Sequence, residues 1–453
     1  MAGGTWTSQN KELSGVYVRA KSAERVTANI GTKGVVAIAK NLSWGETGKV
    51  MEIAAGTDVS PYIGVDMSAD EARFLREMLR GSDVTSAPYQ VLLYRYQGTG
   101  GVAASATIGD LTATAKYIGT FGNNITIIVS ADPDEANTFT VQTVVNGVVQ
   151  DAQRVTGISD LVANNFVTFS GTGSLTASAG TALTGGVNPT TTGADDASFL
   201  TAIEPYRFDI LAYDGTDTSI KDVYKTFIVR QNEALGKHCQ LVIASDVANN
   251  KYVISVTNGV ILADGTTISA NQAVWWVAGA EAGALYNQSL TYAQYPTAVS
   301  ANPKQTDDTL KTAVRTGQIA FFDEFGTVKV QSDINTKTTI IPTEGKEFCK
   351  NRVMRVVNQF ANDCYQYFAQ YFVGKVDNND SGRNLLRGWC VGYLNEMMAN
   401  NGIRDFGVGD VTVEQGNDID SVLVNVLVHP VDAIEKIYVT LTVDANAAVV
   451  TAV

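Results

Sequence analysis

The chain has 453 residues, of which 45% are hydrophobic and 17% charged, so it can bury a sizeable core and we expect two or more domains. Its formal net charge of −13 argues against a nucleic-acid coat or a membrane-surface protein, because either would need a clustered basic patch. No run approaches the roughly 18 apolar residues of a membrane span, and the N-terminus lacks the features of a secretion signal. We therefore expect a soluble protein made in a cytoplasm, where its four widely spaced cysteines stay as free thiols.

The N-terminal part of the chain changes character near residue 23. Residues 1–22 are polar and Gly-rich around an isolated Trp6, a pattern typical of a disordered terminus or of an arm that becomes ordered on docking. Residues 23–97 alternate between strand and helix patterns, with a helix predicted over Asp70–Arg80 and a buried strand over Val91–Tyr96. This order predicts an α/β layer.

A second change of character begins at Gly98. Residues 98–192 are rich in Gly, Thr, Ser and Val and contain few helix-forming runs, and Phe139–Gln150 alternates around the hairpin signal Asn146-Gly147. We interpret this stretch as an inserted all-β domain. The helix–strand order returns over residues 193–345, so these residues and residues 23–97 are predicted to form one discontinuous domain.

Residues 346–453 begin with two long amphipathic helices, predicted over Lys346–Val373 and Asn384–Asn400. Four basic residues lie near the start of the first helix, where the helix dipole disfavours cations by a few tenths to ~1 kcal/mol each. They indicate an acidic group nearby, or simply a solvated basic face. These residues are Lys346, Lys350, Arg352 and Arg355.

Two strands are predicted at the C-terminus. The first alternates over Val422–Val428 and stops at Pro430, which cannot donate to a sheet ladder. The second places one set of apolar residues on one face, with Tyr438, Thr440 and Thr442 on the other, and a terminal strand of this kind is available for pairing with another chain. Its apolar set is Ile437, Val439, Leu441 and Val443.

The chain contains little that could support catalysis. It has only two histidines, His238 and His429, neither with a partner at metal-ligand spacing, and it has no GxxxxGK phosphate-binding loop. We therefore predict no enzyme activity, no metal and no cofactor. A β-rich hydrolase stays open as an alternative, because the two carboxylates of a glycosidase need not be close in sequence.

The segment His429–Tyr438, with the sequence HPVDAIEKIY, resembles the C-terminal signature of contractile phage tail sheath proteins, especially those of Gram-positive phages and phage-tail-like bacteriocins. Gly15-Val16-Tyr17 and Lys116–Asn124 are similar to segments of the same family. The resemblance implies a mixed α/β multi-domain fold with a discontinuous core and extended N- and C-terminal arms. It also implies an outward-facing β domain at 98–192 and an inner domain at 346–453.

The function implied by the resemblance is that of a structural subunit that polymerises helically around a tail tube and contracts to drive the tube through a bacterial envelope. Its expected partners are other copies of itself, the tube protein, and baseplate and tail-terminator proteins, with no nucleic acid and no membrane insertion. A tube or baseplate component is the other alternative. The residues expected in contacts between subunits are Trp6, Gly15, Val16 and Tyr17 in the N-terminal arm and Ile437, Tyr438, Val439, Leu441 and Val443 in the C-terminal strand, and the tube-facing candidates are Lys346, Lys350, Arg352 and Arg355.

Overall fold

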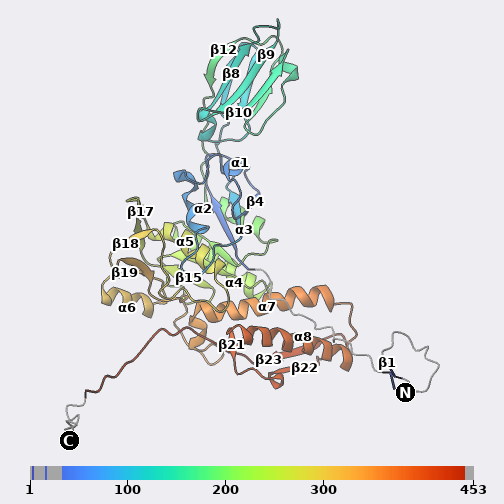
Figure 1. The fold of residues 1–453 in the computed structure, drawn as a ribbon, viewed down its shortest axis with the longest axis vertical. Coiled ribbons are helices and arrows are strands. Elements are labelled where there is room, and N and C mark those ends of the chain that lie inside the picture. Colours follow the sequence, from blue (N-terminus) through green and yellow to red (C-terminus); the bar gives the residue numbers. More distant parts are fainter. Residues whose placement is uncertain (1–2, 5–15, 18–32, 444–453) are drawn as a thin grey trace. The chain divides into compact units, whose positions relative to one another are not determined.

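The computed structural model describes residues 3–4, 16–17 and 33–443, and its elements are labelled in Figure 1. It is a mixed α/β structure with several sheets, which confirms the fold class expected from the sequence. The chain divides into two compact units, one of Gly31–Gln366 with Pro430–Val453 and one of Met1–Ile30 with Tyr367–His429.

The first unit is built around a six-stranded sheet whose strands come from both sides of the Gly-rich stretch, so the α/β core is discontinuous. The strands are β3 (Val35–Lys40), β4 (Val50–Ala54), β5 (Gln90–Arg95), β13 (Ile210–Ala212), β14 (Gln240–Ala244) and β15 (Val253–Val256). Their order is β15-β14-β13-β3-β5-β4, and all neighbours are parallel except β4 and β5. The inner strands are buried throughout, as expected for a parallel sheet covered on both faces.

Helices cover both faces of this sheet. The helices of the first unit are α1 (Ser60–Ile63), α2 (Arg73–Met78) after the 3-10 turn η1 (Asp70–Ala72), α3 (Gly193–Ile203), α4 (Thr218–Glu233), α5 (Ala270–Gly283) and α6 (Asp307–Arg315). Side chains of α2 and α5 share one hydrophobic core with one face of the sheet, and those of α3 and α4 share another core with the opposite face.

The helix α5 is buried almost throughout, because its small residues allow close packing. A Cβ atom on Gly279 would lie 1.9 Å from the carbonyl oxygen of Met78, and one on Gly283 would lie 1.9 Å from that of Ser86. Ser269 caps the first turn, where its hydroxyl accepts a hydrogen bond from the Gln272 amide. The Ala-Gly-rich stretch of the sequence is therefore a core helix.

The inserted residues form a β-sandwich of two sheets (Figure 1, strands β8, β9, β10 and β12 in one sheet). The strands are β6 (Ser105–Ile108), β7 (Leu111–Ala115), β8 (Ile125–Ala131), β9 (Phe139–Val145), β10 (Val148–Val155), β11 (Val167–Ser170) and β12 (Ser178–Ala182), in the orders β10-β9-β8-β12 and β11-β7-β6. The hairpin β9–β10 turns at Asn146-Gly147, which confirms the predicted hairpin. The entry and exit of the insertion pair with each other at Thr99 and Thr190.

A buried aromatic side chain from the α/β core extends into the sandwich. Trp44, in the loop after β3, belongs to the hydrophobic core of the sandwich, with its ring centroid 5.1 Å from that of Tyr117 and 5.0 Å from that of Phe121. Arg95, at the end of β5, is fully buried and donates a hydrogen bond of 2.8 Å to the carbonyl oxygen of Ile118 and others to the loop that carries Trp44. The insertion is thus held by side chains as well as by its two connections.

Smaller sheets complete the first unit. One contains β16 (Gly259–Leu262), β17 (Thr267–Ile268) and β18 (Ala298–Asn302), and the other is the hairpin of β19 (Phe321–Glu324) and β20 (Thr327–Val330). A 3-10 turn, η4 (Lys346–Cys349), precedes the long helix α7 (Asn351–Tyr371), so the predicted helix over Lys346–Val373 begins five residues too early.

The second unit contains the end of α7, where the rings of Tyr367 and Phe368 pack on Trp389 of the next helix. Its elements are α8 (Asp380–Ala399), β21 (Ile403–Arg404), β22 (Val411–Gln415), β23 (Val422–Val426) and β24 (His429–Pro430), together with the two-residue parallel pair β1 (Gly3–Gly4) and β2 (Val16–Tyr17). The first predicted C-terminal strand is therefore β23, which ends at Val426.

Candidate assembly site

The chain after β24 has no helix or strand among its described residues, and it falls into two parts by exposure. In the arm root, which we define as Val431–Glu435, half-buried and exposed residues alternate. In the free arm, defined as Ile437–Val443, every residue is exposed. The period-2 alternation of Ile437, Val439, Leu441 and Val443 therefore has no partner sheet within the described part of this chain.

The free arm carries the five residues expected in contacts between subunits. Their exposed fractions lie between 79% and 89%, and each has a large apolar side chain. Exposure of so many neighbouring apolar groups is unfavourable in water, at about 25 cal/mol per Å² of apolar surface. The residues are Ile437, Tyr438, Val439, Leu441 and Val443.

The arm root is attached to the first unit through Glu435. One oxygen of this carboxylate forms an ion pair with Lys350 Nζ, and the other accepts a hydrogen bond of 2.8 Å from the Thr291 hydroxyl. Asp432 lies farther from Lys350, with 3.8 Å between Oδ2 and Nζ. Both Glu435 and Lys350 are only slightly exposed, at 16% and 20% of their side-chain surface.

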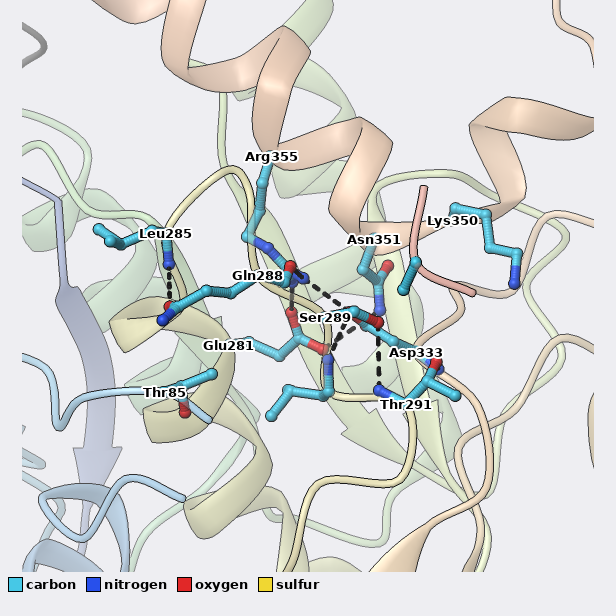
Figure 2. Close-up of polar contacts among 12 residues, drawn as sticks. Thr85, Glu281, Leu285, Gln288, Ser289, Thr291, Asp333, Lys350, Asn351 and Arg355 are labelled. Carbon is cyan, nitrogen blue, oxygen red and sulfur yellow. Dashed lines mark hydrogen bonds and ion pairs between the residues drawn. The ribbon is translucent and has the colours of Figure 1, made fainter. Parts of the chain in front are cut away.

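Thr291 connects this pair to a buried charge network (Figure 2). Its hydroxyl accepts a hydrogen bond of 2.9 Å from the backbone amide of Asp333. The Asp333 carboxylate pairs with Arg355 at 2.6 Å, and Arg355 also pairs with Glu281. These three charged side chains are exposed by no more than 1%.

Three distant segments supply this network, because Glu281 lies on α5, Asp333 follows β20 and Arg355 lies on the second turn of α7. Oδ2 of Asp333 accepts a further hydrogen bond of 2.9 Å from the Leu290 amide, and Arg355 donates one of 2.7 Å to the Gln288 carbonyl oxygen. Buried charges of this kind are tolerated only when they are paired and hydrogen-bonded.

Two carboxyl groups share the single charge of Arg355. Burial, together with the Asp333 carboxylate, raises the pKa of Glu281 well above its ordinary value. Burial alone would also raise the pKa of Asp333, but the charge of Arg355 and hydrogen bonds from Glu281 and the Leu290 amide outweigh it and lower that pKa. The pKa values of the two carboxyl groups are therefore shifted in opposite directions, which favours a proton on Glu281 over one on Asp333.

The four tube-facing candidates differ in how far the structure buries them. Arg355 is buried in the network just described, and Lys350, whose side chain is 20% exposed, has its ammonium group paired with Glu435. Lys346 is exposed and Arg352 is half-buried. The acidic groups that the four basic residues indicated belong to the chain itself.

Sequence reasoning missed Thr291, Glu281, Asp333 and Glu435 as members of one site. Glu435 lies within the HPVDAIEKIY segment, but no local pattern links it to Thr291, which is 144 residues away in the sequence. Of the predicted N-terminal residues, Trp6 and Gly15 lie outside the described residues. Val16 and Tyr17 form β2, which pairs in parallel with β1.

Strand β23 in the second unit has a free edge in the part of the chain that the structure describes. It pairs only with β22 in the described part of the chain, so the outer edge of this two-stranded sheet has no strand beside it there. Leu423 of β23 is about half exposed. An edge of this kind is a ready template for another strand.

Two kinds of site were sought without result in the described ranges. No group of three or more His, Cys, Asp or Glu side chains there is arranged to hold a metal ion. None of the helices that the structure describes is long and apolar enough to cross a membrane.

Comparison with known proteins identifies the family to which this architecture belongs. Three family models match the chain: the phage tail sheath protein β-sandwich domain over residues 99–188, the central domain over 190–336 and the C-terminal domain over 343–444. The phage-like element PBSX protein XkdK of Bacillus subtilis is 32% identical, with 98% of this chain and the whole of that protein covered.

Solved structures agree with these matches. The crystal structure of the sheath tail protein from Desulfitobacterium hafniense is 39% identical, with a TM-score of 0.84 and coverage of 94% of this chain and 99% of that one. The contracted helical sheath of the anti-feeding prophage has the same fold at 10% identity, with a TM-score of 0.57 and coverage of 96% of this chain and 100% of that one. The chain belongs to the phage tail sheath protein family, the structural proteins of contractile tails and tail-like particles.

Proposed function

We propose that this protein polymerises into a helical sheath in which the C-terminal arm of each subunit adds a strand to the sheet of a neighbour. The observation that carries the proposal is the free arm, whose apolar residues alternate with the period of a strand and are exposed on both faces. Adding an extended segment to a sheet edge supplies main-chain hydrogen bonds and buries alternate side chains.

The edge of β23 in a neighbouring subunit is the proposed acceptor. The contact is heterologous, since the arm of one copy meets a different surface of the next, and such contacts generate open helices rather than closed dimers. The N-terminal arm, with Trp6 and Gly15-Val16-Tyr17, is proposed to join the same shared sheet.

Contraction is proposed to draw its energy from the interfaces between subunits. The sequence contains no phosphate-binding loop, so the extended sheath is expected to be a metastable state that relaxes as subunits rotate and bury more surface. Each additional ~100 Å² of buried apolar surface per subunit would release ~2.5 kcal/mol. Hundreds of subunits would together suffice to drive a tube through a bacterial envelope.

The remaining partners follow from the same assembly. Lys346 and Arg352 are the proposed contacts to an acidic tail tube, and the β-sandwich is proposed to face outward. Baseplate and tail-terminator proteins would bind the two ends of the sheath. Assembly is expected in the bacterial cytoplasm.

Proline substitutions in the free arm test strand addition directly. Proline cannot donate a ladder hydrogen bond, and alternate amides of an added strand point to its partner. At least one of the variants Val439→Pro and Thr440→Pro should therefore abolish the helical tubes seen by negative-stain electron microscopy. The thermal midpoint of the monomer should stay unchanged in both variants, because both residues are exposed. Val439→Thr, which keeps the amide and the branched shape, is the control and should still form tubes.

A second sample lacking residues 1–22 tests the N-terminal arm in the same way and should fail to form tubes. Normal tubes from both proline variants would contradict strand addition by the free arm. A full-length chain that stays monomeric even when mixed with its tail tube would contradict the proposal of a helical sheath.

A further inference from the structure

The arm root lies on its own subunit, and the chain leaves that subunit at Lys436. Val431, Ala433 and Glu435 are half-buried, whereas Asp432 and Ile434 between them are exposed. From Lys436 to Val443 this alternation stops and every residue is exposed. One side of an extended chain therefore faces the first unit up to Glu435 and no farther.

Glu435 makes the specific contacts of the arm root. Its carboxylate meets two partners from different segments, Lys350 before α7 and the Thr291 hydroxyl after α5. Hydrogen bonds between charged groups are about twice as strong as neutral ones and fix geometry more closely. Val431 and Ala433 are half-buried apolar residues, which provide no comparable directional contact.

The partners of Glu435 are themselves held in place. Thr291 is bonded to the Asp333 backbone, and the carboxylate of Asp333 is bonded to the buried Arg355 (Figure 2). Lys350 immediately precedes Asn351, whose side chain donates to Glu281 at 3.3 Å. The contacts of Glu435 are thus connected through hydrogen bonds to the buried network of Glu281, Asp333 and Arg355.

A shifted arm would lose these contacts. A shift by one residue exchanges the inward and outward faces of an extended chain. A shift by two residues keeps the faces but sets Ala433 or Ile437 opposite Lys350 and leaves its ammonium group without a carboxylate. Only one alignment of the arm root satisfies Lys350 and Thr291 together.

We infer that Glu435 is a positioning residue that anchors the arm root to its own subunit, so that exchange between subunits begins at Lys436 and the register of the shared strand is counted from Glu435. The inference rests on the proposed function for its second half, the shared strand. The seven residues of the free arm would reach about 23 Å at ~3.3 Å per residue.

Tryptic release of the C-terminal peptide tests the anchor in the full-length chain. Residues 437–453 contain no Lys or Arg, so cleavage after Lys436 releases them as one peptide, whose appearance mass spectrometry can follow. Lys350→Glu and Thr291→Val leave the arm sequence intact and remove one partner of Glu435 each. Trypsin must also bind the residues before Lys436, including the half-buried Glu435, so cleavage tracks the population of the detached arm root when detachment is fast. We therefore expect release about tenfold faster in each variant.

Lys346→Glu is the matched control for the release assay, which contains no tail tube, since it reverses an exposed charge in the turn η4 just before Lys350 and should leave the release rate unchanged. Circular dichroism melting confirms that each variant is folded, and Thr291→Val keeps the test decisive should Lys350→Glu fail to fold. Unchanged release in both partner variants would overturn the anchor.

Electron microscopy then tests the register. Lys350→Glu should form few or irregular tubes, and Lys350→Glu with Glu435→Lys, which restores an opposite pair, should recover regular ones. Fast release combined with normal tubes from Lys350→Glu would overturn the role of Glu435 in register. Failure of the unaltered chain to polymerise would count against the proposed function alone, because the release rates decide the anchor in the monomer.

Discussion

At the scale of single residues, the buried network around Arg355 combines groups with opposite responses to pH. Because the pKa of Glu281 is raised above its ordinary value of 4.5, the folded state binds a proton there more tightly than the unfolded chain does. The contribution of Glu281 to the free energy of unfolding therefore falls as pH rises above that value. Asp333 behaves in the opposite way, because its pKa is lowered and its contribution is lost only as pH falls through the folded value.

Glu281→Gln should leave the protein as stable as the original or more stable, and most clearly so at pH 8. A glutamine has the shape of the protonated carboxyl group and releases no proton, so the loss of stability with rising pH should become smaller. A buried oxygen of Asp333, Oδ1, has no hydrogen-bond donor among the described residues unless Glu281 carries a proton, and the glutamine amide can serve as that donor. Urea denaturation between pH 5 and pH 8 measures the effect.

Arg355→Met is the comparison within the same network. It keeps much of the stem and removes the charge, so an ionised carboxylate is left buried and unpaired at a cost of about 3–5 kcal/mol. If Glu281→Gln costs as much as Arg355→Met, Glu281 is ionised in the folded protein and the protonation scheme is wrong.

The same residues show where sequence reasoning reaches its limit. Four cations near the start of one helix indicated an acidic group, and the structure supplies Glu281, Asp333 and Glu435. Their identities could not be predicted, because each comes from a different distant segment and the local pattern around each is that of an ordinary helix or loop. The burial of Arg355 could not be predicted either, because a basic residue near the start of a helix is more often exposed than buried.

At the scale of elements, two hairpins with nearly the same turn differ in one residue. Asn146-Gly147 joins β9 to β10 with φ angles of 48° and 81°, and Phe325-Gly326 joins β19 to β20 with φ angles of 49° and 78°. Positive φ at the first position favours Asn, Asp or Gly. Phenylalanine is strained there, and its side chain is 93% exposed.

Phe325→Asn should stabilise the protein by about 0.5–1 kcal/mol, since it relieves backbone strain and removes little buried contact. Its ring lies 5.7 Å from Lys329 Nζ, an exposed cation–π contact of about 0.5 kcal/mol, which offsets part of the gain. The reverse change at the other hairpin, Asn146→Phe, should destabilise the protein. Thermal unfolding of both variants measures the difference. A lower midpoint for Phe325→Asn would show that the contacts of the Phe325 ring stabilise the protein by more than the relief of backbone strain does.

Elements with strong local signals were predictable, and those that depend on a partner were not. The hairpin at Asn146-Gly147, the buried strand predicted over Val91–Tyr96 and the long helix α7 follow from turn chemistry and hydrophobic period. The second C-terminal strand has the right period over Ile437–Val443 but no strand assignment, because a strand exists only when its hydrogen bonds are matched by a neighbour.

At the scale of the whole molecule, the α/β core and the β-sandwich share a hydrophobic core through Trp44. Nothing in the sequence around Trp44 indicated this contact, because its partners Tyr117, Phe121 and Phe166 lie in the insertion. The pairing of Thr99 with Thr190 nevertheless leaves the ends of the insertion adjacent.

Deletion of residues 100–189 therefore closes the backbone easily but should give an aggregating protein, because the indole of Trp44 and the apolar surface around it become exposed. Adding Trp44→Ser to the same deletion should restore a larger soluble fraction, measured by size-exclusion chromatography. Equal solubility of the two deletion variants would show that exposure of Trp44 is not the cause of aggregation when the sandwich is removed.

In the intact chain, Trp44→Ala should lower the free energy of unfolding by about 3–5 kcal/mol, and Trp44→Phe, which keeps an aromatic ring, should lower it by less.

The Trp44 contact also constrains how such a chain can change by descent. A single deletion of the sandwich leaves the indole of Trp44 without the core in which it is buried. The protein that carries only this deletion is therefore at a disadvantage until a second change replaces Trp44 in the loop after β3. Gain or loss of the insertion is thus tied to the residue at position 44. In an alignment of sheath sequences, a large aromatic residue there should accompany aromatic residues at positions 117 and 121, and chains without the insertion should have a small or polar residue in its place.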